Sequence, residues 1–562
     1  MAGGDTGSKL GGLLPLATDT LSTAGAEIFN TASDTFVEVS SLNTSRESAT
    51  PVVLPNGLTL IVGGQTCSAQ TYGSTSGFQC NALNTAELYN ESTQSFTFAG
   101  SGSGGVMTSQ RSGPSATLIE GSGTSLDGQV LIVGGSSGSS FLSTATTPPA
   151  GSPPGQTALF TAELYNPATD TFTATQSIPG CAAGVSSCAT GLPAVCNGPA
   201  SAISTATESG TTVTITMSSA LPTGLSVGNK VEIFTSSVAG YNGTFTVTAI
   251  SGLTFQYTDT SSSLASGTGG FAEAAGMAQC GLVDQGAALI PNDGGQVLLA
   301  GGDLIQFLGE SSNLSFIFNP ATQTFTKTTG NLTTPRELSS LVAMDPAVVT
   351  GPLSGQLVTF GGVEANSAVC TTPGDIVVTT VNTAEVFDPS TQTWSAAANT
   401  MGVKRAAVAT LIETGSLAGE VIIPGGVDVE AGTFPSTCVL VTSLKQAAQS
   451  ETDLYAPDTG TGGTFTATGS LNQAREGEDS AVLVNGTDST DLIVIGGACT
   501  TSTPTLESAV IGSSQAATTC GSSNAQNDYS ELYSQSSKTW TVGPTFASGY
   551  TPANDPASAV LP

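Results

Sequence analysis

Short runs of alternating apolar and polar residues cover most of the chain, and clusters of Gly, Asn, Pro, Ser and Thr separate them. Runs of this length and period are typical of β-strands bounded by turns. The pattern therefore predicts an all-β protein.

One strand–turn–strand segment recurs seven times along the chain. Each copy has a short apolar strand, a polar turn and a second strand that opens on Phe or Trp, which is typical of a β-hairpin. The copies occupy residues 26–36, 86–96, 162–172, 315–325, 384–394, 452–465 and 530–540. Self-similarity of this kind indicates a repeat architecture.

Two further signals recur in a fixed order before the hairpins. Six hairpins follow an apolar run that ends in a glycine pair: Gly63-Gly64, Gly134-Gly135, Gly301-Gly302, Gly361-Gly362, Gly425-Gly426 and Gly496-Gly497. Five units begin with an arginine and a small or apolar strand: Arg46, Arg111, Arg336, Arg405 and Arg475. These are all the arginines of the chain, so each unit is expected to hold four strands.

The order of arginine, Gly-Gly and aromatic positions resembles the kelch repeat family over nearly the whole chain outside residues 197–276. The resemblance implies a kelch-type β-propeller, in which four-stranded blades surround an axis. We expect seven blades, the last closed by the C-terminal segment 557–562 against the N-terminal hairpin. Six blades is the alternative, if that hairpin is no true blade. Leu282 and Ala553 replace the arginine in two units, and Phe316 replaces the usual acid in one.

The spacing of the hairpins doubles once, which indicates an insertion. Residues 197–276 contain alternating strands split by Gly and Asn turns, without the repeat motif. The sequence thus predicts a first propeller part (1–196), an inserted β-sandwich or barrel-like module (197–276) and a second propeller part (277–562).

Ten cysteines lie in segments that look like loops, without the Cys-x2-Cys spacing of zinc sites. We expect disulfides and therefore an extracellular or cell-surface location. Sequence leaves the connectivity open, and the expected pairs are Cys67–Cys80, Cys181–Cys188, Cys196–Cys280, Cys370–Cys438 and Cys499–Cys520. We expect neither a transmembrane segment nor a signal peptide within the chain.

Composition excludes several functions. The chain has no His, so Ser-His-Asp catalysis and the histidine-bound copper of galactose oxidase are impossible. Its net charge of -31 would repel nucleic-acid phosphates. We expect no enzyme activity and no cofactor or metal, with Ca²⁺ as the one ion that the acids could hold.

Two groups of charged residues are candidate sites. The arginines could form a cationic ring for an anionic ligand, or they could bind loop carbonyls between blades or the acids that open the hairpins: Glu27, Glu87, Glu163, Glu385, Asp453 and Glu531. Regular repetition favours pairing. Glu476, Glu478 and Asp479 break the repeat and could form a general acid/base pair or a Ca²⁺ site. We favour a solvated loop beside Arg475.

The connections between the second and third strands of the units are long, and they share one face with the cysteines. We expect this face to bind partners. The function predicted is a non-catalytic adhesion, scaffold or self-assembling protein, whose partners are proteins or copies of itself. The alternative is a carbohydrate-binding or carbohydrate-acting protein that uses this face.

Overall fold

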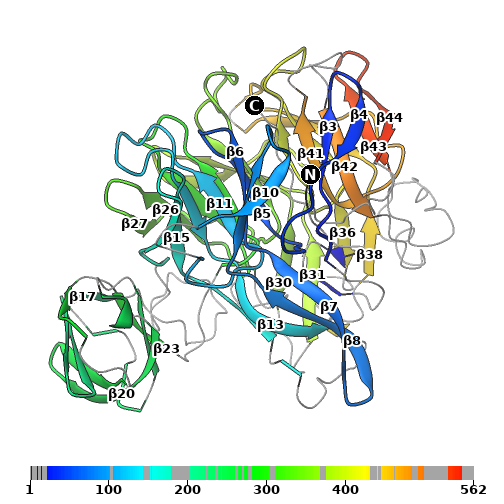
Figure 1. Cartoon of the computed structure of the whole chain (residues 1–562). Coiled ribbons are helices and arrows are strands. Elements are labelled where there is room, and N and C mark those ends of the chain that lie inside the picture. Colours follow the sequence, from blue (N-terminus) through cyan, green and yellow to red (C-terminus); the bar gives the residue numbers. More distant parts are fainter. Residues whose placement is uncertain are drawn as a thin grey trace.

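A computed structural model confirms the all-β class, with many small antiparallel sheets (Figure 1). It describes Ala2 and residues 9–10, 14–15, 22–178, 201–275 and 282–546, apart from internal gaps, the longest of which are 101–105, 143–151, 304–310, 367–374, 431–438, 484–491 and 499–528. Within these ranges the one helical element is the 3₁₀ turn η1 (Ala239–Tyr241), and no helix there could cross a membrane.

Six sheets, numbered 1 to 6 here, share one plan of four antiparallel strands, named a to d in chain order. The strands are β5 (Thr50–Val53), β6 (Leu58–Val62), β9 (Ala86–Asn90) and β10 (Ser95–Phe98) in sheet 1; β11 (Ser115–Leu118), β12 (Val130–Val133), β15 (Ala162–Asn166) and β16 (Thr171–Thr175) in sheet 2; β24 (Gly286–Leu289), β25 (Val297–Ala300), β26 (Ser315–Asn319) and β27 (Thr324–Lys327) in sheet 3; β28 (Ser340–Ala343), β29 (Leu357–Phe360), β32 (Ala384–Asp388) and β33 (Thr393–Ala396) in sheet 4; β34 (Thr410–Leu411), β35 (Val421–Pro424), β39 (Thr452–Ala456) and β40 (Thr464–Ala467) in sheet 5; and β41 (Glu476–Val482), β42 (Leu492–Ala498), β43 (Tyr529–Ser534) and β44 (Thr539–Thr545) in sheet 6.

Successive sheets pack against one another through apolar faces. The a strands lie side by side in the order β5, β11, β24, β28, β34 and β41. Strand b is buried on both faces in sheets 2 to 5, in keeping with a sequence that is apolar there except for Thr359. One core cluster joins sheets 2 and 3, and another joins sheets 4 and 5. Burial of strand faces between neighbours therefore holds the sheets in sequence.

The glycine pairs form the joints between sheets. Both glycines of each pair have positive φ, a conformation that glycine adopts without strain. The second glycine donates its N–H to the carbonyl of the next sheet's arginine, or of Leu282 in its place: Gly64 to Arg111 (2.8 Å), Gly135 to Leu282 (2.9 Å), Gly302 to Arg336 (2.8 Å), Gly362 to Arg405 (3.1 Å) and Gly426 to Arg475 (3.1 Å). A Cβ on the first glycine would meet the same carbonyl oxygen, at 2.2 Å for Gly134. The joint has no room for a side chain.

The N-terminal hairpin, β3 (Glu27–Asn30) and β4 (Thr35–Glu38), lies between sheets 6 and 1. Phe36 packs on Phe546 with ring centroids 4.8 Å apart, and Ser40 donates its N–H to Gln94 (3.2 Å). Strands β1 (Lys9–Leu10) and β2 (Leu14–Pro15) pair with each other, and β1 contacts β41. The segment 557–562, expected to close the last blade, lies outside the described residues.

Two accessory sheets arise from the b–c connections of neighbouring units. Accessory sheet A joins the connections of sheets 1 and 2, in the order β14 (Gly155–Ala158), β13 (Ser136–Leu142), β8 (Thr75–Ala82) and β7 (Gln65–Tyr72). Accessory sheet B joins those of sheets 4 and 5 through β30 (Val363–Asn366), β31 (Asp375–Thr380), β36 (Val427–Glu430) and β38 (Lys445–Ala448), with β37 (Val439–Leu440) on β31. Because the strands alternate in direction, all b–c connections leave from one face.

Residues 201–275 form a separate closed barrel, which stands to one side of the other sheets in Figure 1. Its strands are β17 (Ser201–Ser209), β18 (Thr212–Met217), β19 (Lys230–Phe234), β20 (Gly243–Ser251), β21 (Thr254–Thr258), β22 (Gly267–Thr268) and β23 (Phe271–Ala275). Pairings run β17–β18–β21–β20–β19–β23 and return to β17, so the sheet closes on itself. Side chains such as Ile215, Val231 and Phe255 fill its interior. Its first and last strands are neighbours, with Ser201 opposite Ala272.

The glycine joint yields a matched pair of variants. Gly134 and Gly121 both have φ +67, but only Gly134 would place a Cβ against backbone. We expect Gly121→Ala to lower the free energy of unfolding by about 1 kcal/mol, the cost of the left-handed conformation. Gly134→Ala should cost about 3 kcal/mol or more, because the joint must also open. Urea denaturation measures both, and equal losses would contradict the joint.

Candidate functional site

All five arginines form buried ion pairs with an acid on strand c of their own sheet. The shortest N–O separations join Arg46 and Glu87 (2.7 Å), Arg111 and Glu163 (2.9 Å), Arg336 and Glu385 (2.8 Å), Arg405 and Asp453 (2.5 Å), and Arg475 and Glu531 (3.3 Å). Every arginine is fully buried. The cationic groups are therefore inside the scaffold and do not form a solvent-accessible ring.

Each arginine also binds the backbone at the end of strand b. Arg336 donates through Nη1 to the carbonyls of Gly361 (2.8 Å) and Thr383 (3.1 Å), and through Nη2 to Thr383 Oγ1 (3.0 Å). Arg46, Arg111 and Arg475 likewise donate to the carbonyl of the first glycine of their pair. The planar guanidinium thus holds two strands together at the glycine joint.

The acid of each pair fixes the segment that enters the sheet. Glu385 accepts hydrogen bonds from the N–H groups of Thr333 (2.7 Å) and Thr334 (3.1 Å), just before Arg336. Glu87, Glu163 and Glu531 each accept two N–H groups in the same way. These hydrogen bonds satisfy a carboxylate that is removed from water.

Burial shifts the pKa values of three residues in these pairs. Desolvation lowers the pKa of Arg46 and of Arg336, while their acid partners oppose that change. Desolvation also raises the pKa of Asp453, against the effect of Arg405. In these pairs the charge of the partner opposes the effect of desolvation, so an external anion would have to displace that partner.

Sheet 3 replaces the ion pair with an apolar contact. Leu282 stands at the arginine position and Phe316 at the acid position, and both are buried in one core cluster. The carbonyl of Leu282 still accepts the N–H of Gly135. Ala553, at the arginine position of the last unit, lies outside the described residues.

The acids that follow Arg475 lie in a strand, which corrects the expectation of a solvated loop. Glu476 and Glu478 belong to β41 and pair with Ala498 and Gly496 of β42. Asp479 accepts the N–H of Ser480 (2.8 Å). Strand formation follows from pairing with the apolar β42, the next strand of the same sheet.

A different acid, Glu337, is deeply buried beside other carboxylates. Glu337 is 2% exposed, and its Oε1 accepts no hydrogen bond there. The glycine joint between sheets 3 and 4 places Asp303 beside it, and Leu338 donates its N–H to the carbonyl of Asp284 (3.0 Å). Burial raises the pKa of Glu337 well above its usual range, and the charges of Asp303 and Asp284 raise it further. Asp303 was not singled out from sequence, although it replaces an uncharged residue after the glycine pair.

The structure contains the expected disulfide between Cys67 and Cys80. The carboxylate of Glu47 lies 3.0 Å from Cys67 Sγ. Because both sulfurs are in the disulfide, this cluster offers no thiolate to a metal. The other expected pairs lie outside the described residues: Cys181–Cys188, Cys196–Cys280, Cys370–Cys438 and Cys499–Cys520.

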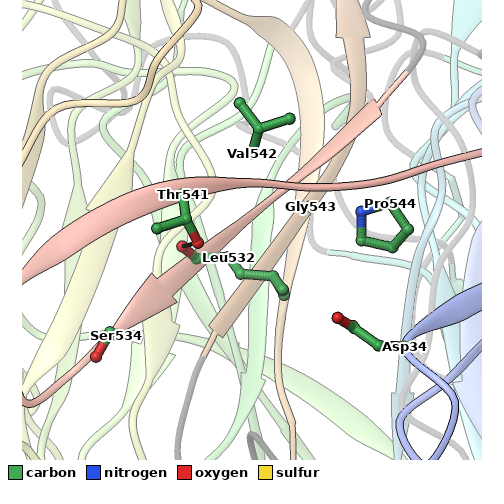
Figure 2. Close-up of a pocket in the computed structure, with 7 residues that line it drawn as sticks. All are labelled: Asp34, Leu532, Ser534, Thr541, Val542, Gly543 and Pro544. Atoms are coloured by element: carbon green, nitrogen blue, oxygen red, sulfur yellow. Dashed lines mark hydrogen bonds between the residues drawn. The ribbon is translucent and has the colours of Figure 1, made fainter.

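A cavity of about 490 Å³ opens beside the N-terminal hairpin (Figure 2). Asp34 lines one side, and residues 532, 534 and 541–544 of sheet 6 line the other. Its polar side chains are one carboxylate and the hydroxyls of Ser534 and Thr541. General acid–base catalysis on a glycoside needs a second carboxyl group, which this lining does not supply.

No family model matches the chain, and no curated protein matches it. Among solved structures, it is similar to that of YjhT, with 11% identity over 89% of this chain and 98% of that chain and a TM-score of 0.41. It is also similar to a copper complex of a fungal alcohol oxidase of the AA5 family, with 11% identity over 86% of this chain and 89% of that chain and a TM-score of 0.31.

Sheet 3 suggests how to test the ion pair in sheet 4. Arg336→Leu leaves Glu385 buried without its cation, so we expect a loss of about 3–5 kcal/mol in the free energy of unfolding. The double variant Arg336→Leu/Glu385→Phe copies sheet 3 and should lose less than Arg336→Leu alone. Urea denaturation of both single variants and the double variant measures the coupling. Additive losses would contradict it.

Glu337 should make the fold less stable as pH rises. Its folded pKa exceeds the usual value of about 4.3, so its contribution is present below that pH and is lost as pH rises through the raised pKa. We expect Glu337→Gln to unfold at higher urea concentration than wild type at about pH 8, and the two to converge near pH 4.

A second variant, at a carboxyl whose pKa is lowered, serves as a control because its effect on stability at high pH should be opposite. Hydrogen bonds from Ser390 lower the pKa of the partly buried Asp388, so Asp388→Asn should be slightly less stable than wild type at about pH 8. A Glu337→Gln protein that is also less stable at this pH would contradict the assignment.

Proposed function

We propose that the chain is a non-catalytic extracellular or cell-surface protein that binds protein partners through one face of a propeller scaffold. The burial of all five arginines in ion pairs carries this proposal. A chain without histidine, whose five arginines are buried in ion pairs, has no imidazole for general acid–base catalysis and keeps six lysines as its other cationic side chains. The disulfide between Cys67 and Cys80 supports an oxidising compartment.

The scaffold we propose is a seven-bladed ring of the kelch type. Six four-stranded sheets follow one another with adjacent a strands, and the hairpin β3–β4 contacts sheets 6 and 1. In sheets 1, 2, 4 and 5 the residue before the glycine pair is the register partner of the residue before the strand c acid, for example Val133 of Ala162. Ala2 pairs with Ala26, the residue before Glu27, in the same way. Ala2 precedes Gly3 and Gly4 in sequence. This position supports a seventh unit.

The face that carries the accessory sheets is the binding surface we propose. Sheets A and B leave from the b–c side, where their strands extend beyond the six repeated sheets (Figure 1). The hairpin 65–82 of sheet A contains no charged residue. Burial of this hairpin removes no charge from water, which suits a protein–protein contact.

The hairpin of sheet A allows a test of this surface. Replacing residues 69–78 by Asn-Gly leaves Ser68 and Gln79, which are register partners, around a two-residue turn. We expect labelled protein with this change to bind intact cells of the producing organism at least about tenfold more weakly than wild type, the effect of losing an interface anchor.

Ser92→Lys on the c–d turn of sheet 1 is the control and should bind like wild type, because c–d turns lie on the opposite face. Unchanged binding by the shortened hairpin, or hydrolysis of glycans by the wild type that Glu478→Gln abolishes, would contradict the proposal.

A further inference from the structure

Hydrogen bonds to the c–d turns form a second set of joints between neighbouring units. From the N-terminal hairpin round to sheet 6, the segment that follows strand d of one unit donates to the c–d turn of the next. The donors and acceptors are Ser40 and Gln94 (3.2 Å), Gly100 and Asp170 (2.7 Å), Thr175 and Gln323 (3.5 Å), Gly330 and Gln392 (2.9 Å), Ala398 and Gly462 (3.2 Å), and Gly469 and Lys538 (3.1 Å). These bonds hold the outer strands of neighbouring units together.

The joint between sheet 6 and the N-terminal hairpin lacks this bond. Asp34 occupies the left-handed position of the hairpin turn (φ +55), as Gln94 and Lys538 do in theirs. Among the described residues, no hydrogen bond from sheet 6 reaches Asp34. The cavity of about 490 Å³ opens at this place instead, with Asp34 on one side and strands β43 and β44 on the other (Figure 2).

The sequence accounts for the missing bond. Four of the donors stand four residues after the aromatic residue of strand d: Ser40, Gly100, Ala398 and Gly469. In sheet 6 the residue four positions after Trp540 is Pro544, which has no N–H to donate. The register of β44 against β43 also shifts beyond Val542. The open joint is therefore specific to this unit.

The cavity offers acceptors and apolar surface. Asp34 brings an exposed carboxylate. The Thr541 hydroxyl donates to the carbonyl of Leu532 (3.4 Å), so its oxygen can still accept. Val542, which is 59% exposed, and Pro544 add apolar surface. The seven lining residues include no Lys, Arg or aromatic residue, so a ligand must bring its own donors and finds no ring on which a sugar could stack.

We propose that this cavity binds a lysine or arginine side chain of a partner protein. The cationic head donates to the Asp34 carboxylate, and the aliphatic stem lies on Val542 and Pro544. The net charge of -31 attracts basic segments to the chain, and the volume lies in the usual range of ligand pockets. The site lies at a c–d turn, away from the b–c face, so it is additional to the function proposed above.

Fluorescence anisotropy with labelled tri-lysine tests the charge contact. At about 0.15 M salt, which screens contacts with distant charges, wild type should bind the peptide. Asp34→Asn should weaken binding about fivefold, the effect of an exposed ion pair. Glu91→Gln removes the same charge from the c–d turn of sheet 1 and should bind like wild type. Tri-lysine with acetylated ε-amines should not bind.

Filling the cavity tests its location. Val542→Trp adds a large side chain to the lining without changing a charge, and we expect it to weaken tri-lysine binding about tenfold or more. Val37→Trp is the matched control, because Val37 is also exposed (43%) but does not line the cavity. It should bind like wild type. Urea denaturation of both variants checks that each is folded.

Three results would overturn the inference: no binding by wild type, equal binding by Asp34→Asn and Glu91→Gln, or binding by Val542→Trp that matches wild type. The variant with the shortened hairpin of accessory sheet A should bind tri-lysine like wild type. Loss of cell binding in that variant therefore tests the proposed function alone, and the two failures are distinguishable.

Discussion

The buried ion pair between an arginine and the strand c acid is the interaction on which the repeat depends. Removing both charges from water is costly, and it becomes tolerable only because nearly every donor and acceptor finds a partner. In sheet 4 the guanidinium reaches the end of strand b while the carboxylate of Glu385 holds the incoming segment. The same arginine offers its carbonyl to the glycine joint of the preceding sheet. One residue thus fixes its own sheet and the position of its neighbour.

Sheet 3 has the glycine joint without the ion pair. Leu282 and Phe316 replace the charges by an apolar contact, yet the carbonyl of Leu282 still receives the N–H of Gly135. The backbone joint is therefore kept where the ion pair is not. Geometry at the joint requires glycine, whereas the buried side chains can be either a matched ion pair or a matched apolar pair.

The sequence predicted those features of the fold that depend on residues close together in the chain. The strands, the glycine positions, the arginine partners and the Cys67–Cys80 pair follow from motifs within single units. The accessory sheets could not be predicted, because they pair segments of neighbouring units whose register no local motif sets. Glu476 was expected in a loop because Glu476, Glu478 and Asp479 break the repeat pattern. Ala2 and Asp303 could have been found by aligning every position around the glycine pairs.

The closed barrel of residues 201–275 has a consequence for how the chain folds. Its first and last strands are neighbours, so the long segment between Ile178 and Leu282 behaves as a much shorter tether once the barrel has formed. The entropy cost of bringing sheet 3 onto sheet 2 grows with the length of flexible chain between them. Early folding of the barrel would therefore speed the docking of the later-synthesised half of the molecule onto the earlier half.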